Sequence, residues 1–150
     1  MKLNVPVQGD TYLGSSTVEV VDNMEDEGNG SLVLMIKYRE TSFIFTGDME
    51  QEQESLICDS YGDDKEWNVS LLKVAHHGSK TSTSYRFVRM LMPDYAIISV
   101  GKNSYGHPSE QTLSRLDQAN VKEVYRTDRS GNIVVDVISG GRELRVTPSR

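Results

Sequence analysis

The sequence predicts a layered α/β fold, in which a mixed sheet carries three helices on one face. Short apolar runs with the length of strands recur along the chain, and segments predicted as helices separate them. A length of 150 residues favours one domain with a single core. The runs expected to build the sheet are Leu32–Tyr38, Ser42–Thr46, Leu71–Ala75, Ala96–Val100 and Val124–Arg126.

The first strands are expected to form a hairpin at the edge of the sheet. Residues 9–14 and Thr17–Val21 give two strands around a Gly-Ser turn, and the second is rich in β-branched residues. Residues 23–30 are acidic and turn-rich, which favours a solvated loop over the alternative of a cation site. The next two strands, at Leu32–Tyr38 and Ser42–Thr46, are almost continuously apolar, which indicates burial on both faces.

Asp48 stands between a strand and a helix and has two interpretations. It precedes an acidic helix start at Met49–Cys58, so its carboxylate can cap the helix by accepting backbone N–H groups. It also follows Gly47, which marks a tight strand exit where a metal ligand can lie. Cys58, the single cysteine, is predicted to be a small apolar residue on the helix face, and the lack of a second cysteine excludes an internal disulfide and a zinc thiolate cluster.

The second helix is predicted at Tyr85–Met92, where Pro93 ends it. Ser82, Thr83 and Ser84 are its candidate N-caps. Because hydroxyl and amide donors gather at this N-terminus, it is also expected to attract an anion.

The last third of the chain is predicted to hold one helix and three strands. The helix opens at Pro108-Ser109, and the strand Val124–Arg126 leads into a hairpin turn at Asp128–Gly131. Two closing strands, at residues 132–138 and 143–146, follow around a Gly-Gly pair.

All three histidines of the chain follow strands of the predicted sheet. His76 and His77 come directly after one buried run, and His107 ends the loop after the next run. In α/β folds, sites gather where strands end, because the sheet holds the loops in place. We therefore expect Asp48 and the histidines in one cluster, which suits zinc, or manganese if the missing ligands are carboxylates.

The two adjacent histidines are expected to have different roles. Neighbouring side chains of an extended segment point to opposite faces, so His76 and His77 cannot both reach one metal from a regular strand. His77 is favoured as the ligand because it lies next to Gly78, where the strand has ended, and His76 would orient it or contact substrate. For His107, a structural role in a Gly-Pro turn is the alternative to a role in the site.

Composition limits the classes of function. The net charge is −6 and the pI is near 5.0, so there is no basic stripe, and affinity for nucleic acid would depend on the metal. The chain starts without an apolar signal core, and no run approaches the roughly 20 apolar residues of a membrane span, so a soluble chain without signal peptide is expected. A phosphate-binding Gly-rich loop, a Ser-His-Asp order and a Cys-His nucleophile are all missing.

Three motifs, in this order and at this spacing, carry a resemblance to a known family. They are Phe45-Thr46-Gly47-Asp48, Leu72–Ser79 and Ser104–Pro108. From about Gly9 to Val137 the chain resembles the metallo-β-lactamase-fold domain at the C-terminus of competence proteins of the ComEC/Rec2 type, and stand-alone hydrolases related to it. The resemblance implies an αββα sandwich and a dinuclear zinc or manganese site. It also implies hydrolysis of phosphodiester bonds, with nucleic acid (DNA) as the substrate in DNA uptake.

The resemblance also assigns roles to residues. Asp48 matches the bridging aspartate and the His76-His77 pair contains the last histidine ligand, so Asp48, His77 and His76 are the expected metal ligands. His107 and His76 are the expected catalytic residues, with His107 protonating a leaving oxygen or binding phosphate as a cation. Contacts to substrate are expected from Ser79, Ser104, Tyr105 and His107.

One part of the family's pattern is missing, because no histidine precedes His76 and the HxHxDH-type motif is therefore absent. The resemblance then implies that residues 1–150 form a single partial domain, the C-terminal half, whose partner is an N-terminal half carrying that motif. On its own the chain is expected to hydrolyse phosphodiesters weakly or not at all. The alternative is a non-catalytic fragment or interaction module.

A partial domain also has consequences for assembly. The missing half would leave an apolar face of the sheet uncovered, so a homodimer formed through that face is expected. The parent of such a domain would be a bacterial membrane protein, although this chain itself contains no apolar span.

Overall fold

The computed structural model describes residues 2–4, 16–22, 31–62 and 65–150. Their strands form a six-stranded sheet in the order β2-β3-β4-β5-β6-β7 and a three-stranded sheet in the order β1-β8-β9. The strands are β1 Lys2–Asn4, β2 Ser16–Asp22, β3 Val33–Tyr38, β4 Thr41–Phe45, β5 Leu71–Lys73, β6 Tyr95–Ile98, β7 Glu123–Arg126, β8 Ile133–Ile138 and β9 Glu143–Pro148. The helices are α1 Gln51–Tyr61, α2 Tyr85–Leu91, α3 Glu110–Gln118 and the short α4 Thr127–Ser130, with 3₁₀ turns η1 Lys65–Trp67 and η2 Ala75–Gly78.

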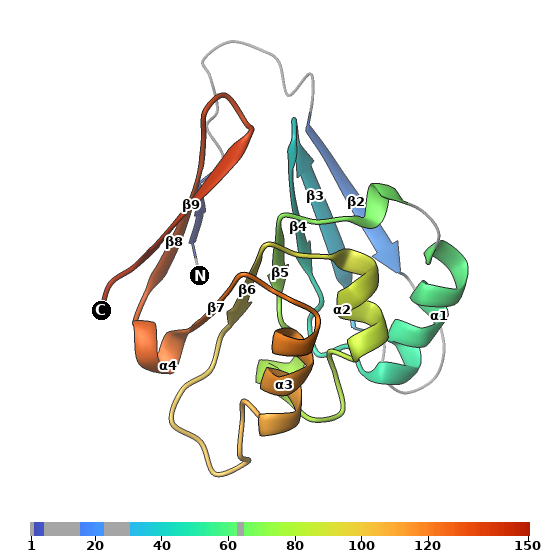
Figure 1. Cartoon of the computed structure of the whole chain (residues 1–150), viewed down its shortest axis with the longest axis vertical. Helices are drawn as coiled ribbons and strands as arrows, with labels where there is room; N and C mark the ends of the chain where they lie inside the picture. Colours follow the sequence, from blue (N-terminus) through green and yellow to red (C-terminus); the bar gives the residue numbers. More distant parts are fainter. Residues whose placement is uncertain (1, 5–15, 23–30, 63–64) are drawn as a thin grey trace.

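The elements stack in three layers, with the six-stranded sheet between the small sheet and the helices α1, α2 and α3 (Figure 1). The predicted α/β class, the mixed sheet and the three helices on one face are confirmed. The five predicted strands correspond to β3, β4, β5, β6 and β7. No helix in the described part of the chain combines the length and apolarity that a membrane crossing requires.

The parallel half of the large sheet determines where the site lies. β4, β5, β6 and β7 are paired in parallel in sequence order, and α1, α2 and α3 connect them. The carboxyl ends of β4, β5 and β6 therefore share one edge of the sheet. Asp48, the His76-His77 pair and the loop 101–107 follow those ends, as the sequence predicts.

Two apolar clusters hold the layers together. On the helix side, Ile44, Leu72 and Ile98 of the sheet pack in one cluster with Phe87 of α2 and Leu116 of α3. Each of these side chains is at most 1% exposed, and full burial of a residue of this size contributes about 1.5–3 kcal/mol. Cys58 lies in the same cluster, on the buried face of α1, which confirms its predicted place.

The second cluster joins the two sheets, and it overturns the expectation of an uncovered face. Phe43, Leu71 and Ile97 are fully buried, and they pack with Ile133 and Val135 of β8. The strands β8 and β9 thus cover the face that was predicted to be bare. The predicted homodimer therefore loses the uncovered apolar face on which it was based, and it stays an untested prediction.

The link between β7 and β8 also differs from the prediction. The segment Asp128–Gly131 is not a hairpin turn, because β7 and β8 belong to different sheets and the chain crosses between them through α4. At the other end of the chain, β2 confirms the predicted strand Thr17–Val21 and pairs with β3 at the sheet edge. The predicted strand at 9–14 and the predicted loop at 23–30 lie outside the described residues.

Candidate functional site

The two adjacent histidines lie in a tight turn, because β5 ends at Lys73 before reaching them. His76 (φ 47°, ψ 43°) and His77 (φ 54°, ψ 22°) both have left-handed backbone conformations, which cost roughly 1–2 kcal/mol each for residues with a Cβ. The rule that neighbouring strand residues face opposite sides therefore does not apply here. Two unfavourable conformations in succession indicate that the surrounding structure holds the turn in place.

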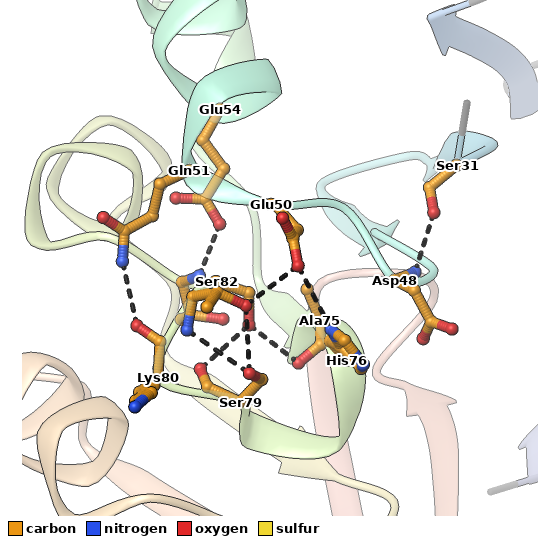
Figure 2. A network of polar contacts seen from close by, with 12 residues as sticks. Ser31, Asp48, Glu50, Gln51, Glu54, Ala75, His76, Ser79, Lys80 and Ser82 are labelled. Carbon is orange, nitrogen blue, oxygen red and sulfur yellow. Dashed lines mark hydrogen bonds and ion pairs between the residues drawn. The ribbon is translucent and has the colours of Figure 1, made fainter. Parts of the chain in front are cut away.

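Buried hydroxyl groups hold this turn in place by hydrogen bonds to main-chain carbonyls. Ser82 donates from Oγ to the carbonyl oxygens of Ala75 and Ser79, at 3.2 and 3.1 Å, and is fully buried (Figure 2). Thr112 of α3, also fully buried, donates to the same Ser79 carbonyl at 2.8 Å. The main-chain N–H of His76 donates to the Gly47 carbonyl at 3.0 Å, which places the turn against the exit of β4.

Glu54 of α1 fixes the other end of the same loop. Its buried carboxylate accepts the main-chain N–H groups of Thr83 and Ser84. Burial raises the pKa of Glu54, and the bonds from Ser84 and Thr83 and the charge of Arg115 act in the opposite direction. Ser84 is the N-cap of α2, as one of the three candidates. Glu54 therefore accepts the two main-chain N–H groups just before α2, and an external anion at this helix start stays a prediction.

Close packing between Gly78 and Pro108 brings the two histidine-bearing segments together. A Cβ on Gly78 would lie 2.5 Å from the Pro108 Cβ, and Gly78 has a φ of +83°. The Ser109 N–H donates to the Gly78 carbonyl at 2.9 Å. As a result, the rings of His76 and His107 lie 5.8 Å apart between centroids, and those of His76 and His77 lie 6.5 Å apart. The predicted convergence of the three histidines is confirmed.

The loop 101–107 depends on the side chain of Asn103. Its Oδ1 accepts the main-chain N–H groups of Tyr105 and His107, both at 3.0 Å. Its Nδ2 donates to the carbonyls of Gly101 and His107, at 2.9 and 2.8 Å. One amide thus closes the loop with four hydrogen bonds.

Asp48 is exposed and does not cap α1, so the capping interpretation is wrong. The N-cap position belongs to Glu50, and no side-chain bond caps it. The Asp48 N–H donates to Ser31 Oγ at 3.0 Å, and the Glu50 carboxylate approaches the His76 ring (Figure 2). Burial lowers the pKa of Lys73, and the negative charge of Asp48 opposes this shift. The structure therefore places a partly buried cation in the field of the Asp48 carboxylate.

The ring nitrogens of the histidines differ in their partners. His77 Nδ1 lies 2.7 Å from the Ser99 carbonyl, so this nitrogen carries the proton and Nε2 of a neutral ring is left with a lone pair. The Nδ1 atoms of His76 and His107 are buried without a hydrogen-bond partner in the described structure. The nearest carboxylate oxygen to His76 Nδ1, Glu50 Oε1, is 3.8 Å away.

His107 has an electrostatic environment that disfavours its charged form. Burial, followed by the neighbouring His76 and His77, lowers the pKa of His107. A neutral imidazole at neutral pH can donate or accept a hydrogen bond. The lowered pKa disfavours the protonated ring that the expected roles as a cation or a general acid require.

The side chains fit a metal in chemical type but not in number. Imidazole nitrogen and carboxylate oxygen suit zinc, and two imidazoles sharing zinc at about 2 Å per bond have centroids roughly 5–6 Å apart. The His76–His107 spacing of 5.8 Å falls in this range, whereas the spacing of the expected ligands His76 and His77, 6.5 Å, is slightly larger. Within residues 2–4, 16–22, 31–62 and 65–150, however, no group of three His, Cys, Asp or Glu side chains is placed to hold a metal ion. Ligands from outside this set would have to complete the site.

The expected substrate-binding residues divide into two kinds. Ser79 is 5% exposed, and its hydroxyl lies 3.0 Å from Thr81 Oγ1, so it stabilises the turn. Ser104 and Tyr105 are exposed on the loop beside His107.

Sequence reasoning missed two residues of the site, Asn103 and Glu50. An asparagine in a short polar loop between two glycines is a turn signal that could have indicated Asn103. Glu50 is one of several acidic residues at the helix start, and nothing in the sequence distinguishes it from its neighbours.

The chain matches the family described as "Metallo-beta-lactamase superfamily" over residues 2–102, and it belongs to that superfamily. This match contains β4, the exit at Asp48 and the His76-His77 turn, and it stops before His107. The fold expected from the three motifs is therefore confirmed in class.

Relatives with known names extend the similarity beyond residue 102. The chain is 42% identical over 108 residues to ComE operon protein 3 of Bacillus subtilis (strain 168), which covers 71% of this chain and 13% of that protein. It is 34% identical over 128 residues to competence protein ComA of Neisseria gonorrhoeae, covering 83% and 18%. It is 31% identical over 120 residues to recombination protein 2 of Haemophilus influenzae (strain ATCC 51907 / DSM 11121 / KW20 / Rd), covering 79% and 14%. The resemblance to competence-type domains is confirmed, and the chain spans less than a fifth of each of these relatives.

Proposed function

We propose that this chain is the histidine-bearing part of a metal-dependent hydrolase that cleaves phosphodiester bonds of DNA during DNA uptake. The observation that carries the proposal is the convergence of His76, His77 and His107 at the carboxyl edge of a parallel sheet, where the His76 N–H bonds to Gly47, the residue before Asp48. Membership of the superfamily supports hydrolysis, and the similarity to a relative named competence protein supports the role in DNA uptake.

Each residue of the cluster has a proposed task. Asp48, His77 and His76 would each contribute a ligand to zinc or manganese ions that a second half helps to hold, with His77 binding through Nε2 because the Ser99 carbonyl orients its ring. When bound, two such metals supply a water of lowered pKa and clamp the attacking and leaving oxygens. His107, neutral at neutral pH, would hydrogen-bond to an oxygen of the phosphodiester.

The same geometry predicts that the chain alone has little activity. Catalytic zinc takes about three protein ligands, and the described residues provide no group of three in reach of one ion. We propose that an N-terminal half with the HxHxDH-type motif supplies the others. Weak metal binding should accompany the weak activity.

Metal binding and hydrolysis test the proposal together. The chain is assayed alone and fused to a segment that carries the HxHxDH-type motif, by calorimetric zinc titration and by hydrolysis of bis-p-nitrophenyl phosphate and of DNA. We expect tight zinc binding and turnover only in the fused form, with about a hundredfold loss or more in Asp48→Ala and His77→Ala. Asp59→Ala is the matched control, because Asp59 is an exposed carboxylate of α1 paired with Arg86. Robust turnover by the chain alone, abolished by both site substitutions, would contradict the predicted dependence on a second half.

The same assay decides the alternative function. The lack of a three-residue metal group in the described structure also fits a non-catalytic interaction module. A fused form that binds no zinc and hydrolyses neither substrate would favour that module over the hydrolase.

A further inference from the structure

A depression of about 460 Å³ opens beside the histidines and is lined mainly by the segment that follows β6. Its largely apolar lining includes His77, His107, Val100, Thr127, Lys102 and Tyr105. A volume of this size holds a small organic group, since ligand sites usually measure about 300–1,000 Å³. The depression therefore has room for part of a substrate whose reacting bond lies at the histidines.

Tyr105 is the unusual member of this lining, because 81% of it is exposed although its position is fixed. The Asn103 side chain holds the Tyr105 backbone, and the Tyr105 ring stacks beside the His107 ring at 6.0 Å between centroids and 26° between planes. An aromatic ring held open to solvent offers a flat face to another flat ring. Stacking of a nucleobase on such a platform contributes about 1–3 kcal/mol per base.

Lys102 adds a positive charge to the same depression. It is exposed, and no ion pair involves it within the part of the chain that the structure describes. In a chain of net charge −6, a cation next to an aromatic platform favours an occupant that is both flat and anionic. Nucleotides combine these two properties, and the apolar part of the lining argues against a bare phosphate.

We propose that this depression is a base-stacking subsite, in which Tyr105 stacks on a nucleobase next to the bond to be cleaved and Lys102 contacts the adjoining phosphate. The position relative to the cleaved bond depends on the proposed function, whereas binding of the base does not. The occupant is a base that is free to leave its own stack, so the subsite fits a single strand or a frayed end.

Binding without metal separates this inference from the hydrolase proposal. The affinity of the 150-residue chain for oligothymidylate is measured by fluorescence anisotropy at low salt with a chelator present. An abasic oligomer of the same length and charge provides the comparison. We expect about tenfold tighter binding of oligothymidylate, which is the effect of one stacked base. If the fused form fails to hydrolyse DNA, the hydrolase proposal fails but the tenfold difference in affinity should remain. If the fused form hydrolyses DNA and the affinities of the two oligomers are equal, only the subsite proposal fails.

Substitutions then identify the platform. Tyr105→Ala should abolish the preference for the base, while Tyr105→Phe should retain it because stacking does not need the hydroxyl. Tyr85→Ala, at a half-exposed tyrosine on α2, should change nothing. Lys102→Gln should weaken both oligomers equally and reduce the salt dependence by about one counterion. Equal affinity of the unaltered chain for both oligomers, no binding to either, or an equal loss in Tyr105→Phe and Tyr105→Ala would overturn the proposal.

Discussion

The two segments that bring histidines to the site, the turn Ala75–Gly78 and the loop 101–107, are held by different means. The turn is held from the interior of the protein, where fully buried Ser82 donates to the Ala75 carbonyl and fully buried Thr112 donates to the carbonyl of Ser79, just after the turn. The loop is exposed along most of its length and is closed by the Asn103 side chain. The histidines of the turn are therefore held by bonds to the core, whereas His107 in the loop is held mainly by the amide of one neighbouring residue.

This difference predicts different responses to substitution. A segment whose bonds lie in the core cannot change without loosening the layers around it, so damage there should lower the free energy of unfolding of the whole chain. A segment closed by exposed local bonds can open while the core stays folded. Stability measurements should separate the two, and binding measurements should report on both.

The largest effect is expected from Gly78→Ala, which should lower the free energy of unfolding by about 3 kcal/mol. Part of this, about 1–2 kcal/mol, comes from forcing a Cβ into a left-handed conformation. The rest comes from the overlap of the new Cβ with Pro108, at 2.5 Å in the present backbone. Urea unfolding measures the change.

Gly106→Ala is the matched control for this prediction. Gly106 has a similar φ of +76°, but no heavy atom lies within 4 Å of the position that a Cβ would occupy. It should therefore cost only about 1–2 kcal/mol, the left-handed contribution alone. Equal losses in the two variants would show that the contact with Pro108 does not hold the segments together.

Glu54→Gln should have the next largest effect, about 1–2 kcal/mol of unfolding free energy at mildly acidic pH. Both oxygens of the Glu54 carboxyl group can accept a hydrogen bond, also when one of them is protonated, whereas the NH₂ group of a glutamine cannot accept and would leave one of the two main-chain N–H groups unpaired. Glu52→Gln, on the exposed side of the same helix, is the control and should stay within about 0.5 kcal/mol of the unaltered chain.

The pH dependence of this effect has a defined sign. Burial, the largest cause, raises the pKa of Glu54 above its ordinary value of 4.5, so the folded state holds the proton more tightly than the unfolded state does. The stability that Glu54 contributes is then fully present below the unfolded pKa and is lost as the pH rises through the folded pKa. The stability advantage of the unaltered chain over Glu54→Gln should shrink across that window, and an advantage that grows with pH would refute the assignment.

Much of the fold could be predicted from the sequence because its signals are local. The apolar runs around Ile44, Leu72 and Ile97 are buried on both faces in the structure, as their uninterrupted hydrophobicity predicts. Parallel pairing then placed the exits of β4, β5 and β6 at one edge, so the approach of the three histidines followed from strand order alone. The strands β8 and β9 were predicted, but their assembly with β1 into a separate sheet was not, because the β1–β8 pairing joins residues far apart in the chain, with Lys2 opposite Val134.

The details of the site were less predictable because they depend on tertiary packing. Single histidines enter the left-handed region only occasionally, so two in succession at His76 and His77 have no signal in the sequence, and the packing beneath them fixes their conformation. Asp48 had the position of a helix cap, yet α1 begins two residues later than that interpretation requires. Sequence patterns do not locate the first residue of a helix to within two positions.

The smallest effect on stability, and the sharpest on binding, is expected from Asn103→Ala. Its four hydrogen bonds are exposed and local, so the free energy of unfolding should fall by less than about 1 kcal/mol. The preference for oligothymidylate over the abasic oligomer should nevertheless disappear, because Tyr105 loses the bond that fixes its backbone.

Asn103→Asp keeps the two acceptor bonds to Tyr105 and His107 and loses the two donor bonds, so it should give an intermediate preference. Asn68→Ala, at another exposed asparagine, should affect neither quantity. If Asn103→Ala instead destabilised the chain as much as Gly78→Ala, the loop would be coupled to the core like the turn, and the distinction between the two segments would be wrong.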